Sequence, residues 1–283
     1  QAGKAVLQKL KGANVSSLYY CKNQVEKVIY VPGKNGEEAF VEWANLAESA
    51  ENEVAFSVMY WDKRKLFGVL PVPGEQVLQG IQNLYDKVTS EASQKKYPHG
   101  MTVRILLGVQ FNTIGLDSLN PRTDLRIIVL EQLRELDIPI FETLPNGSEW
   151  KVEVALYEWG QGAGIANSIH SHVKLMVVDN NKMIVSGYHP QYGFQTSDGD
   201  AKNHDLGIKV SGPIAANGMA VFDSLWDGSE ILCTESDVNY SFPNECGTKP
   251  AKNPRHWIFV PSPFDNDIVL PLYRDKWNKT ADE

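Results

Sequence analysis

Hydrophobic residues recur along the chain at two spacings, which alternate from one segment to the next. Apolar residues three and four positions apart predict helices over residues 37–50, 74–94, 124–136 and 213–228. Short apolar or alternating runs predict strands over residues 53–61, 101–111, 151–159, 173–179, 182–189 and 204–212. Because strands and helices alternate, we expect a layered α/β domain.

One predicted hairpin carries unusual chemistry for a pair of strands. The segment IHSHVKLMVVDNNKMIVSGYHPQ, residues 169–191, places histidines and lysines among strand-forming apolar residues. Asn180 and Asn181 separate its two strands, and asparagine tolerates the positive φ angles of a two-residue type I′ turn. A two-residue loop would fix which positions of the two strands face each other.

That register predicts a cluster at the open end of the hairpin. His172 is expected to face His189, and Lys174 to face Gly187, which lacks a side chain and would leave room for a ligand. A neutral imidazole can attack phosphorus, a protonated one can donate to the leaving oxygen, and an ammonium offsets phosphate charge. The cluster favours phosphodiester chemistry. The plainer alternative is a half-buried sheet edge with satisfied polar groups.

Two aspartates near the cluster are expected to have different roles. Asp179 lies beside the turn, roughly 16 Å from Lys174 along an extended strand and on the other face, so it is assigned a structural role. Asp205 begins the next predicted strand. If that strand pairs beside the hairpin, the Asp205 carboxylate is expected to accept the Nδ1 proton of His172 and hold the ring in one tautomer.

Composition narrows the class of protein. Of 283 residues, 42% are hydrophobic, which is enough for one large core. No apolar run approaches the roughly 20 residues of a membrane-spanning helix. The formal net charge of −8 disfavours sequence-independent binding to nucleic acid phosphates, although it leaves room for a local basic site.

Cysteines and glycosylation sequons favour a secreted eukaryotic glycoprotein, located outside the cell or in the secretory-pathway lumen. Cys233 and Cys246 flank a turn-rich loop and are expected to form a disulfide, which leaves Cys21 unpaired or paired outside the chain. Three reduced thiols are the alternative. Asn-x-Ser/Thr sequons begin at Asn14, Asn146, Asn239 and Asn278.

The hairpin and its downstream segment resemble a known family. His172-x-Lys174, followed after four residues by Asp179 and then by Ser186-Gly187-Tyr188-His189, resembles the HKD motif of the phospholipase D superfamily. Residues 203–226, read as an aspartate-bearing strand, a Gly-Pro turn and a helix ending in tryptophan, are similar to the segment that follows the motif there. The resemblance covers most of residues 37–228.

The resemblance implies a mixed β-sheet flanked by helices on both faces, and a phosphodiesterase that works through a phosphohistidine without a metal or another cofactor. It implies that His172 is the nucleophile or acid, that Lys174 binds phosphate and that Asp205 braces the histidine. Gly187 and His189 would lie against the phosphate. The family's usual Gly-Ser-x-Asn reads Ser-Gly-Tyr-His here, so His189 stands where an asparagine normally contacts phosphate.

A second departure concerns the number of motifs. Members of the family need two HKD motifs, and this sequence has one. We therefore expect a partner chain, either a C-terminal half or a homodimer mate. Residues 1–35 are predicted to be an N-terminal segment, residues 36–232 the HKD domain, and residues 233–283 a connector that starts a second homologous half at about residue 268.

Three functions remain open from the sequence. The first is hydrolysis or transfer of phospholipid head groups, in which residues 63–74, a mixture of basic and apolar positions, contact a membrane peripherally or else pack on the protein itself. The second is a nuclease of the same superfamily acting on single-stranded nucleic acid. The third is a non-catalytic binding protein or toxin subunit, because of His189 and the lone motif.

Overall fold

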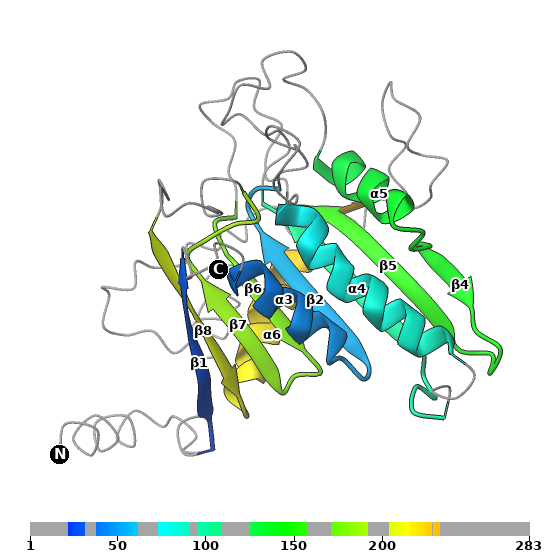
Figure 1. Cartoon of the computed structure of the whole chain (residues 1–283), viewed down its shortest axis with the longest axis horizontal. Coiled ribbons are helices and arrows are strands. Elements are labelled where there is room, and N and C mark those ends of the chain that lie inside the picture. The colour runs from blue at the N-terminus through cyan, green and yellow to red at the C-terminus, as the bar shows by residue number, and fades with distance from the viewer. Residues whose placement is uncertain are drawn as a thin grey trace, which may run out of the picture.

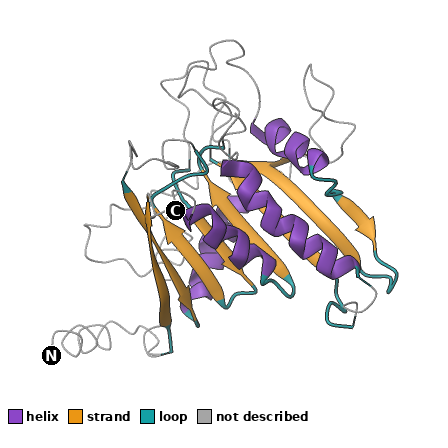
Figure 2. Cartoon of the chain, viewed as in Figure 1, coloured by secondary structure: helices purple, strands orange, loops and turns teal. Residues whose placement is uncertain are grey.

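The computed structural model describes residues 22–31, 38–61, 73–90, 95–108, 125–157, 171–191, 204–227 and 229–232. These residues form one mixed sheet with helices on both faces, as Figures 1 and 2 show. The predicted α/β class and the placement of helices on both faces are confirmed.

The sheet has nine strands in the described part of the chain. They are β1 (Gln24–Val31), β2 (Glu53–Val58), β3 (Met101–Leu107), β4 (Phe141–Thr143), β5 (Glu149–Leu156), β6 (Leu175–Val178), β7 (Lys182–Ser186), β8 (Asp205–Ser211) and β9 (Glu230–Leu232). Their order is β1-β8-β7-β6-β2-β3-β5-β4, with β9 also paired to β5. Strands β2, β3 and β5 are parallel, and the other pairs are antiparallel.

Alternating side chains of the central strands divide the core into two layers. On one face, Phe56 of β2 packs in a large cluster with α3 (Glu38–Glu48), α4 (Pro73–Thr89) and α5 (Leu125–Glu135). On the other face, Ala55 of β2 belongs to a smaller cluster with α6 (Ile214–Trp226). Figure 1 shows α3 and α4 in front of the sheet and α6 behind it. Because successive side chains of a strand point to opposite faces of the sheet, each central strand contributes side chains to both layers.

Three strands were not predicted from the sequence: β1, β4 and β9. β1 lies within residues 1–35, the predicted N-terminal segment, yet it pairs with β8 from Gln24–Ser211 to Val31–Asp205. Its Ile29 and Val31 are buried against the large cluster. This part of the segment therefore belongs to the sheet.

Several predictions fall outside the described residues. They concern Cys21, Cys233, Cys246, Asn14, Asn239, Asn278, residues 233–283 and nearly all of residues 63–74. Asn146 is described: it lies in the exposed turn between β4 and β5, and its Nδ2 donates to the Tyr97 carbonyl at 3.2 Å. Within the described ranges, no helix combines the length and the apolar character that a membrane span requires.

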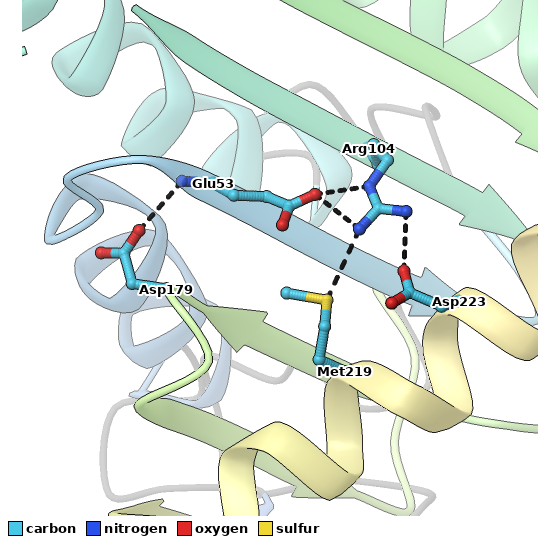
Figure 3. Close-up of polar contacts among 5 residues, drawn as sticks. All are labelled: Glu53, Arg104, Asp179, Met219 and Asp223. Carbon is cyan, nitrogen blue, oxygen red and sulfur yellow. Dashed lines mark hydrogen bonds and ion pairs between the residues drawn. The ribbon is translucent and has the colours of Figure 1, made fainter. Parts of the chain in front are cut away.

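An arginine fixes α6 on the sheet (Figure 3). Nε of Arg104, on β3, donates to Glu53 Oε1 at 2.6 Å, and Nη1 donates to Asp223 Oδ1 of α6 at 2.8 Å. The guanidinium also lies 4.8 Å from the centre of the Phe222 ring. Because the Arg104 side chain is only 14% exposed, its contacts with β2 and α6 are little weakened by water.

We predict that Arg104→Ala lowers the free energy of unfolding by about 2 kcal/mol, because it leaves two carboxylates unpaired and removes packing on Phe222. The matched control is Lys151→Ala. Lys151 pairs with Glu153 at 2.6 Å but is 46% exposed, so about 0.5 kcal/mol or less is expected. Urea titration of both variants is the measurement, and equal losses would contradict the special role of Arg104.

Candidate active site

The predicted cluster lies where the parallel strands end. β2, β3 and β5 run side by side, and residues 171–174 lead into β6 at their carboxyl edge. Ser171 N donates to the carbonyl of Gly108, which follows β3, at 3.1 Å. A Cβ on Gly108 would lie 2.0 Å from the Ser171 carbonyl oxygen, so glycine is needed for this close crossing. Ligands of α/β sheets commonly bind at this edge.

Three side chains of the cluster are gathered in the structure. Lys174 Nζ lies 2.6 Å from His172 Nδ1 and 3.1 Å from Nε2. The rings of His172 and His189 have centroids 5.5 Å apart and are nearly perpendicular. Lys174 and His189 are buried, at 5% and 4% exposure, whereas His172 is exposed. A solvent-accessible imidazole is thus backed by a buried amine and a second, buried imidazole.

The register that led to this prediction was nevertheless wrong. The turn has three residues, Asp179 to Asn181, because Val178 pairs with Lys182 and Leu175 with Val185. Asp179 and Asn180 both have positive φ, so the turn begins one residue earlier than expected.

As a consequence, Lys174 is bonded to Ser186 rather than placed opposite Gly187. The Ser186 amide donates to the Lys174 carbonyl at 3.1 Å. β7 ends at Ser186, and the next amide, that of Gly187, donates to Leu206 of β8 at 3.1 Å. The chain leaves the regular strand at this point, so His189 reaches His172 although the two residues are not paired on a ladder.

The expected ligand space beside Gly187 is also a wrong prediction. A Cβ on Gly187 would lie 2.1 Å from Asp205 Oδ1, so the missing side chain makes room for this carboxylate. Asp205 Oδ1 also accepts the Leu206 amide at 2.7 Å. His172 Nδ1 was expected to donate to the Asp205 carboxylate. In the structure Lys174 Nζ lies next to this nitrogen, so the bond between His172 and Asp205 stays a prediction.

Burial sets the charges of the cluster. It lowers the pKa of Lys174 to about 8, against an opposing effect of the Asp205 charge, which raises it. Burial, with the Coulombic effects of Lys174 and of the protonated form of His172, lowers the pKa of His189 to about 2. Lys174 is therefore mostly protonated at neutral pH, and His189 is a neutral imidazole.

Tyr60 is a neighbour of the cluster that the sequence did not reveal. Its ring centroid lies 5.2 Å from that of His189, in an edge-to-face arrangement. Tyr60 follows β2 by two residues at the same carboxyl edge, and burial raises the pKa of its hydroxyl. Its place just after a buried strand was the available signal.

Asp179 lies at the opposite end of β6 from Lys174. Its two oxygens accept the backbone amides of Glu51, Asn52 and Glu53 at 2.7, 2.7 and 2.9 Å. Figure 3 shows the bond to Glu53, the first residue of β2. The carboxylate thus ties the hairpin turn to the start of the neighbouring strand.

The described residues contain no group of three or more histidine, cysteine, aspartate or glutamate side chains that could hold a metal ion.

Comparisons with known proteins give structural similarity only. No protein-family model matches the sequence, and no curated protein matches it significantly. The phospholipase D family member Nuc of Salmonella typhimurium is 13% identical, with a TM-score of 0.42 over 74% of this chain and 97% of that one. NucT of Helicobacter pylori is 12% identical, with a TM-score of 0.42 over 72% and 97%. Phosphatidylserine synthase of Haemophilus influenzae Rd KW20 is 14% identical, with a TM-score of 0.44 over 97% and 47%.

We predict that Asp179→Ala destabilises the fold by about 2 kcal/mol, since it leaves three amide donors without this acceptor and places alanine at positive φ. Asp179→Asn, which keeps one acceptor oxygen and tolerates positive φ, is the matched control and should lose less. Both variants, assayed well below their melting temperatures, should hydrolyse a soluble phosphodiester like the wild type. A tenfold or larger loss of activity in folded protein would contradict a purely structural role.

The pH dependence of activity should follow Lys174. We predict that kcat/KM for a soluble phosphodiester falls above about pH 8, as the Lys174 ammonium loses its proton. Asp205→Asn removes the charge that raises the pKa of Lys174, so the fall should move to lower pH. The exposed, distant Asp86→Asn is the control and should leave the profile unchanged. Lys174→Arg should abolish the fall in whatever activity remains, because arginine keeps its proton. An unmoved profile in both site variants would exclude Lys174 as its cause.

Proposed function

We propose that this chain is one half of a phosphodiesterase of the phospholipase D superfamily, which hydrolyses or transfers phospholipid head groups through a phosphohistidine on His172. The contact of the buried Lys174 ammonium with the exposed His172 ring, at 2.6 Å, carries the proposal. An ammonium that donates to an imidazole nitrogen requires that ring to be neutral, which is the form of a nucleophile.

The attacking step follows from this contact. A phosphodiester oxygen carries charge and accepts hydrogen bonds better than a neutral ring nitrogen, so a bound substrate draws the Lys174 N–H groups to itself. The ring of His172 is then released. A lone pair of His172 nitrogen forms the bond to phosphorus, and the bond from phosphorus to the leaving oxygen breaks. Lys174 offsets the charge that grows on the non-bridging oxygens.

His189 supports binding rather than proton transfer. Since its pKa is lowered to about 2, it carries no extra proton at neutral pH. A neutral imidazole still has one N–H, which can donate to a phosphate oxygen as the family's asparagine amide does. The substitution of histidine for asparagine therefore retains a neutral donor at this position.

The leaving oxygen needs a proton that this cluster does not supply. His172 is occupied as the nucleophile, His189 is neutral, and proton loss from Lys174 would remove the charge that binds phosphate. We assign the acid to the histidine of a second HKD motif on a partner chain. The same group, once deprotonated, activates the water that cleaves the phosphohistidine.

Phospholipid is the preferred substrate class. One ammonium and neutral imidazoles suit a single phosphodiester, whereas the net charge of −8 opposes a long polyanion. The sequons support a secreted enzyme, and the exposure of Asn146 is compatible with a glycan there. Contact of residues 63–74 with the lipid surface is part of this proposal.

The test is to trap the covalent intermediate with a short-chain phosphatidylcholine. Quenching in alkaline denaturant, followed by mass spectrometry at neutral to alkaline pH, should find a phosphatidyl adduct on His172 that acid treatment removes. His172→Ala should reduce turnover by about a thousandfold or more. The matched control is His99→Ala, because His99 is an exposed histidine in a surface turn and should be dispensable.

A parallel assay on single-stranded DNA separates the substrate classes. Faster turnover of DNA than of phosphatidylcholine would overturn the lipid proposal and favour the nuclease. If His172→Ala leaves both turnover and biological activity intact, the chain is a binding protein or toxin subunit instead.

A further inference from the structure

The ring of Tyr60 lies against His189, one of the residues expected at the phosphate. The two ring centroids are 5.2 Å apart and the ring planes are inclined at 72°, which is an edge-to-face arrangement. Tyr60 follows β2, whereas His189 follows β7, and β6 lies between these two strands in the sheet. The contact therefore bridges the end of the strand into which Lys174 leads.

The backbone on both sides of Tyr60 is held in place. Met59 and Trp61 are buried, at 5% and 0% exposure. Trp61 Nε1 donates to Gln132 Oε1 of α5 at 2.6 Å, in a bond between two buried side chains. A Cβ on Gly74 would lie 2.3 Å from the same nitrogen, so α4 packs directly on the indole. Tyr60 is thus presented to the site from a fixed backbone.

The orientation of the His189 ring is less determined by its own backbone. β7 ends at Ser186, so His189 lies outside the regular strand. Its neighbour Tyr188 is fully buried, with its ring centroid 4.7 Å from that of Trp43. This anchors the backbone but not the imidazole, because the terminal torsion of a histidine is broad and roughly two-fold. Other contacts must decide which edge of the ring faces the phosphate.

Two neighbouring rings limit the rotation of His189. The His172 centroid lies 5.5 Å away at an interplanar angle of 82°, and the Tyr60 centroid lies 5.2 Å away. In the proposed reaction His172 forms and then loses a bond to phosphorus, so its ring must adjust during turnover. Tyr60 takes no part in that bond. It is therefore the support that stays in place throughout the reaction.

An imidazole at position 189 gives an aromatic neighbour a purpose. Edge-to-face ring pairs are favourable because the edge of an aromatic ring is positive and its face negative. The asparagine that the family usually has at this position carries an amide and would gain no such ring pairing. Tyr60 and His189 therefore suit each other in this chain.

The hydroxyl of Tyr60 is a poor candidate for the missing proton donor. Burial raises the pKa of Tyr60 above its ordinary value, so the hydroxyl is a weaker acid than a tyrosine in water. An effective general acid has a pKa near the operating pH. The contribution of Tyr60 is thus expected to come from its ring.

We propose that Tyr60 is a positioning residue whose ring holds the His189 imidazole with its N–H toward the substrate phosphate. The proposal rests on the proposed function, in which His189 donates to a phosphate oxygen. Tyr60 itself touches no reacting atom. Its loss should therefore weaken phosphate binding and leave the attack by His172 largely intact.

Steady-state kinetics on a soluble phosphodiester test the role of the ring. Tyr60→Leu should raise KM about fivefold while kcat stays within about twofold, because the lost contact serves substrate and transition state alike. Tyr60→Phe keeps the ring and should behave as the wild type. Phe141→Leu is the matched control, since Phe141 is 53% exposed on β4 at the far end of the sheet, and both constants should be unchanged.

Two results would contradict the role of the ring. Equal losses in Tyr60→Phe and Tyr60→Leu would assign the effect to the hydroxyl. A fall in kcat with unchanged KM would show that Tyr60→Leu disturbs the attacking groups instead of phosphate binding. If Tyr60→Leu fails to fold, Tyr60→Met takes its place, because methionine also lacks a ring and fills irregular space.

A double-variant cycle with His189→Asn tests whether the two residues act together. His189→Asn installs the residue usual in the family and leaves Tyr60 no ring to hold. In that background Tyr60→Leu should change KM by less than about twofold. The same fivefold rise in both backgrounds would show that Tyr60 acts independently of His189, and the proposal would be wrong.

The affinity for inorganic phosphate, measured by calorimetry, separates this proposal from the proposed function. Suppose that Tyr60→Leu weakens phosphate binding about fivefold, that Tyr60→Phe does not, and that the wild type hydrolyses no phosphodiester. The positioning role would then stand and the phosphodiesterase would fall. Hydrolysis by the wild type, with KM and phosphate affinity unaffected by Tyr60→Leu, would have the opposite meaning. A wild type that neither binds phosphate nor hydrolyses a phosphodiester would refute both.

Discussion

The burial of one ammonium group constrains the whole site. Lys174 is almost without solvent, and its pKa of about 8 records how poorly the charged form is accommodated. Because that value lies below the ordinary lysine pKa of 10.5, the charge costs stability at neutral pH. The cost begins to fall as the pH rises above about 8 and is gone once the pH exceeds the ordinary lysine value. Asp205 and the His172 ring offset part of it. Both depend on strand order: β8 must lie beside β7 to carry Asp205, and β6 must lie beside β2 to hold Lys174 at the carboxyl edge. An anionic ligand would relieve the remaining cost, which couples binding to the fold.

Much of this architecture was predictable because apolar spacing reports burial. All four helices of the described residues and six of the nine strands coincide with segments predicted from spacing, although α4 begins one residue and β5 two residues before the predicted start. β4 and β9 have three residues each, too few to show a period. β1 escaped notice for a different reason. Only Ile29 and Val31 of its eight residues are buried, and its other face is apolar too, so it does not alternate as a solvent-facing strand should.

The sequence was enough to predict which residues lie close together in the site, but not how they are arranged. The spacing of His172 and Lys174 was enough to place both at one end of a strand. The register depended on the turn, and Asn180-Asn181 favoured a two-residue loop, whereas the structure places Asp179 at positive φ as well. The reason is non-local: the Asp179 carboxylate binds amides of residues 51–53, more than a hundred residues earlier in the sequence. The turn preference of Asn180-Asn181 depends only on neighbouring residues, so it could not predict that contact. Nor could it predict that Gly187 makes room for Asp205.

The charges of the cluster explain why one chain is insufficient for the proposed reaction. Two imidazoles and an ammonium lie within a few ångströms, and two of the three are buried. Such a group cannot hold several positive charges, because each added charge raises the cost of the next. The arrangement therefore favours one cation and two neutral rings, which suits phosphate binding and nucleophilic attack but provides no acid. A proton donor must come from a separate environment, where the charge of Lys174 does not oppose its protonation. In the proposed reaction a second motif on a partner chain supplies that donor, while the packing of charge around His172 keeps this ring neutral for attack.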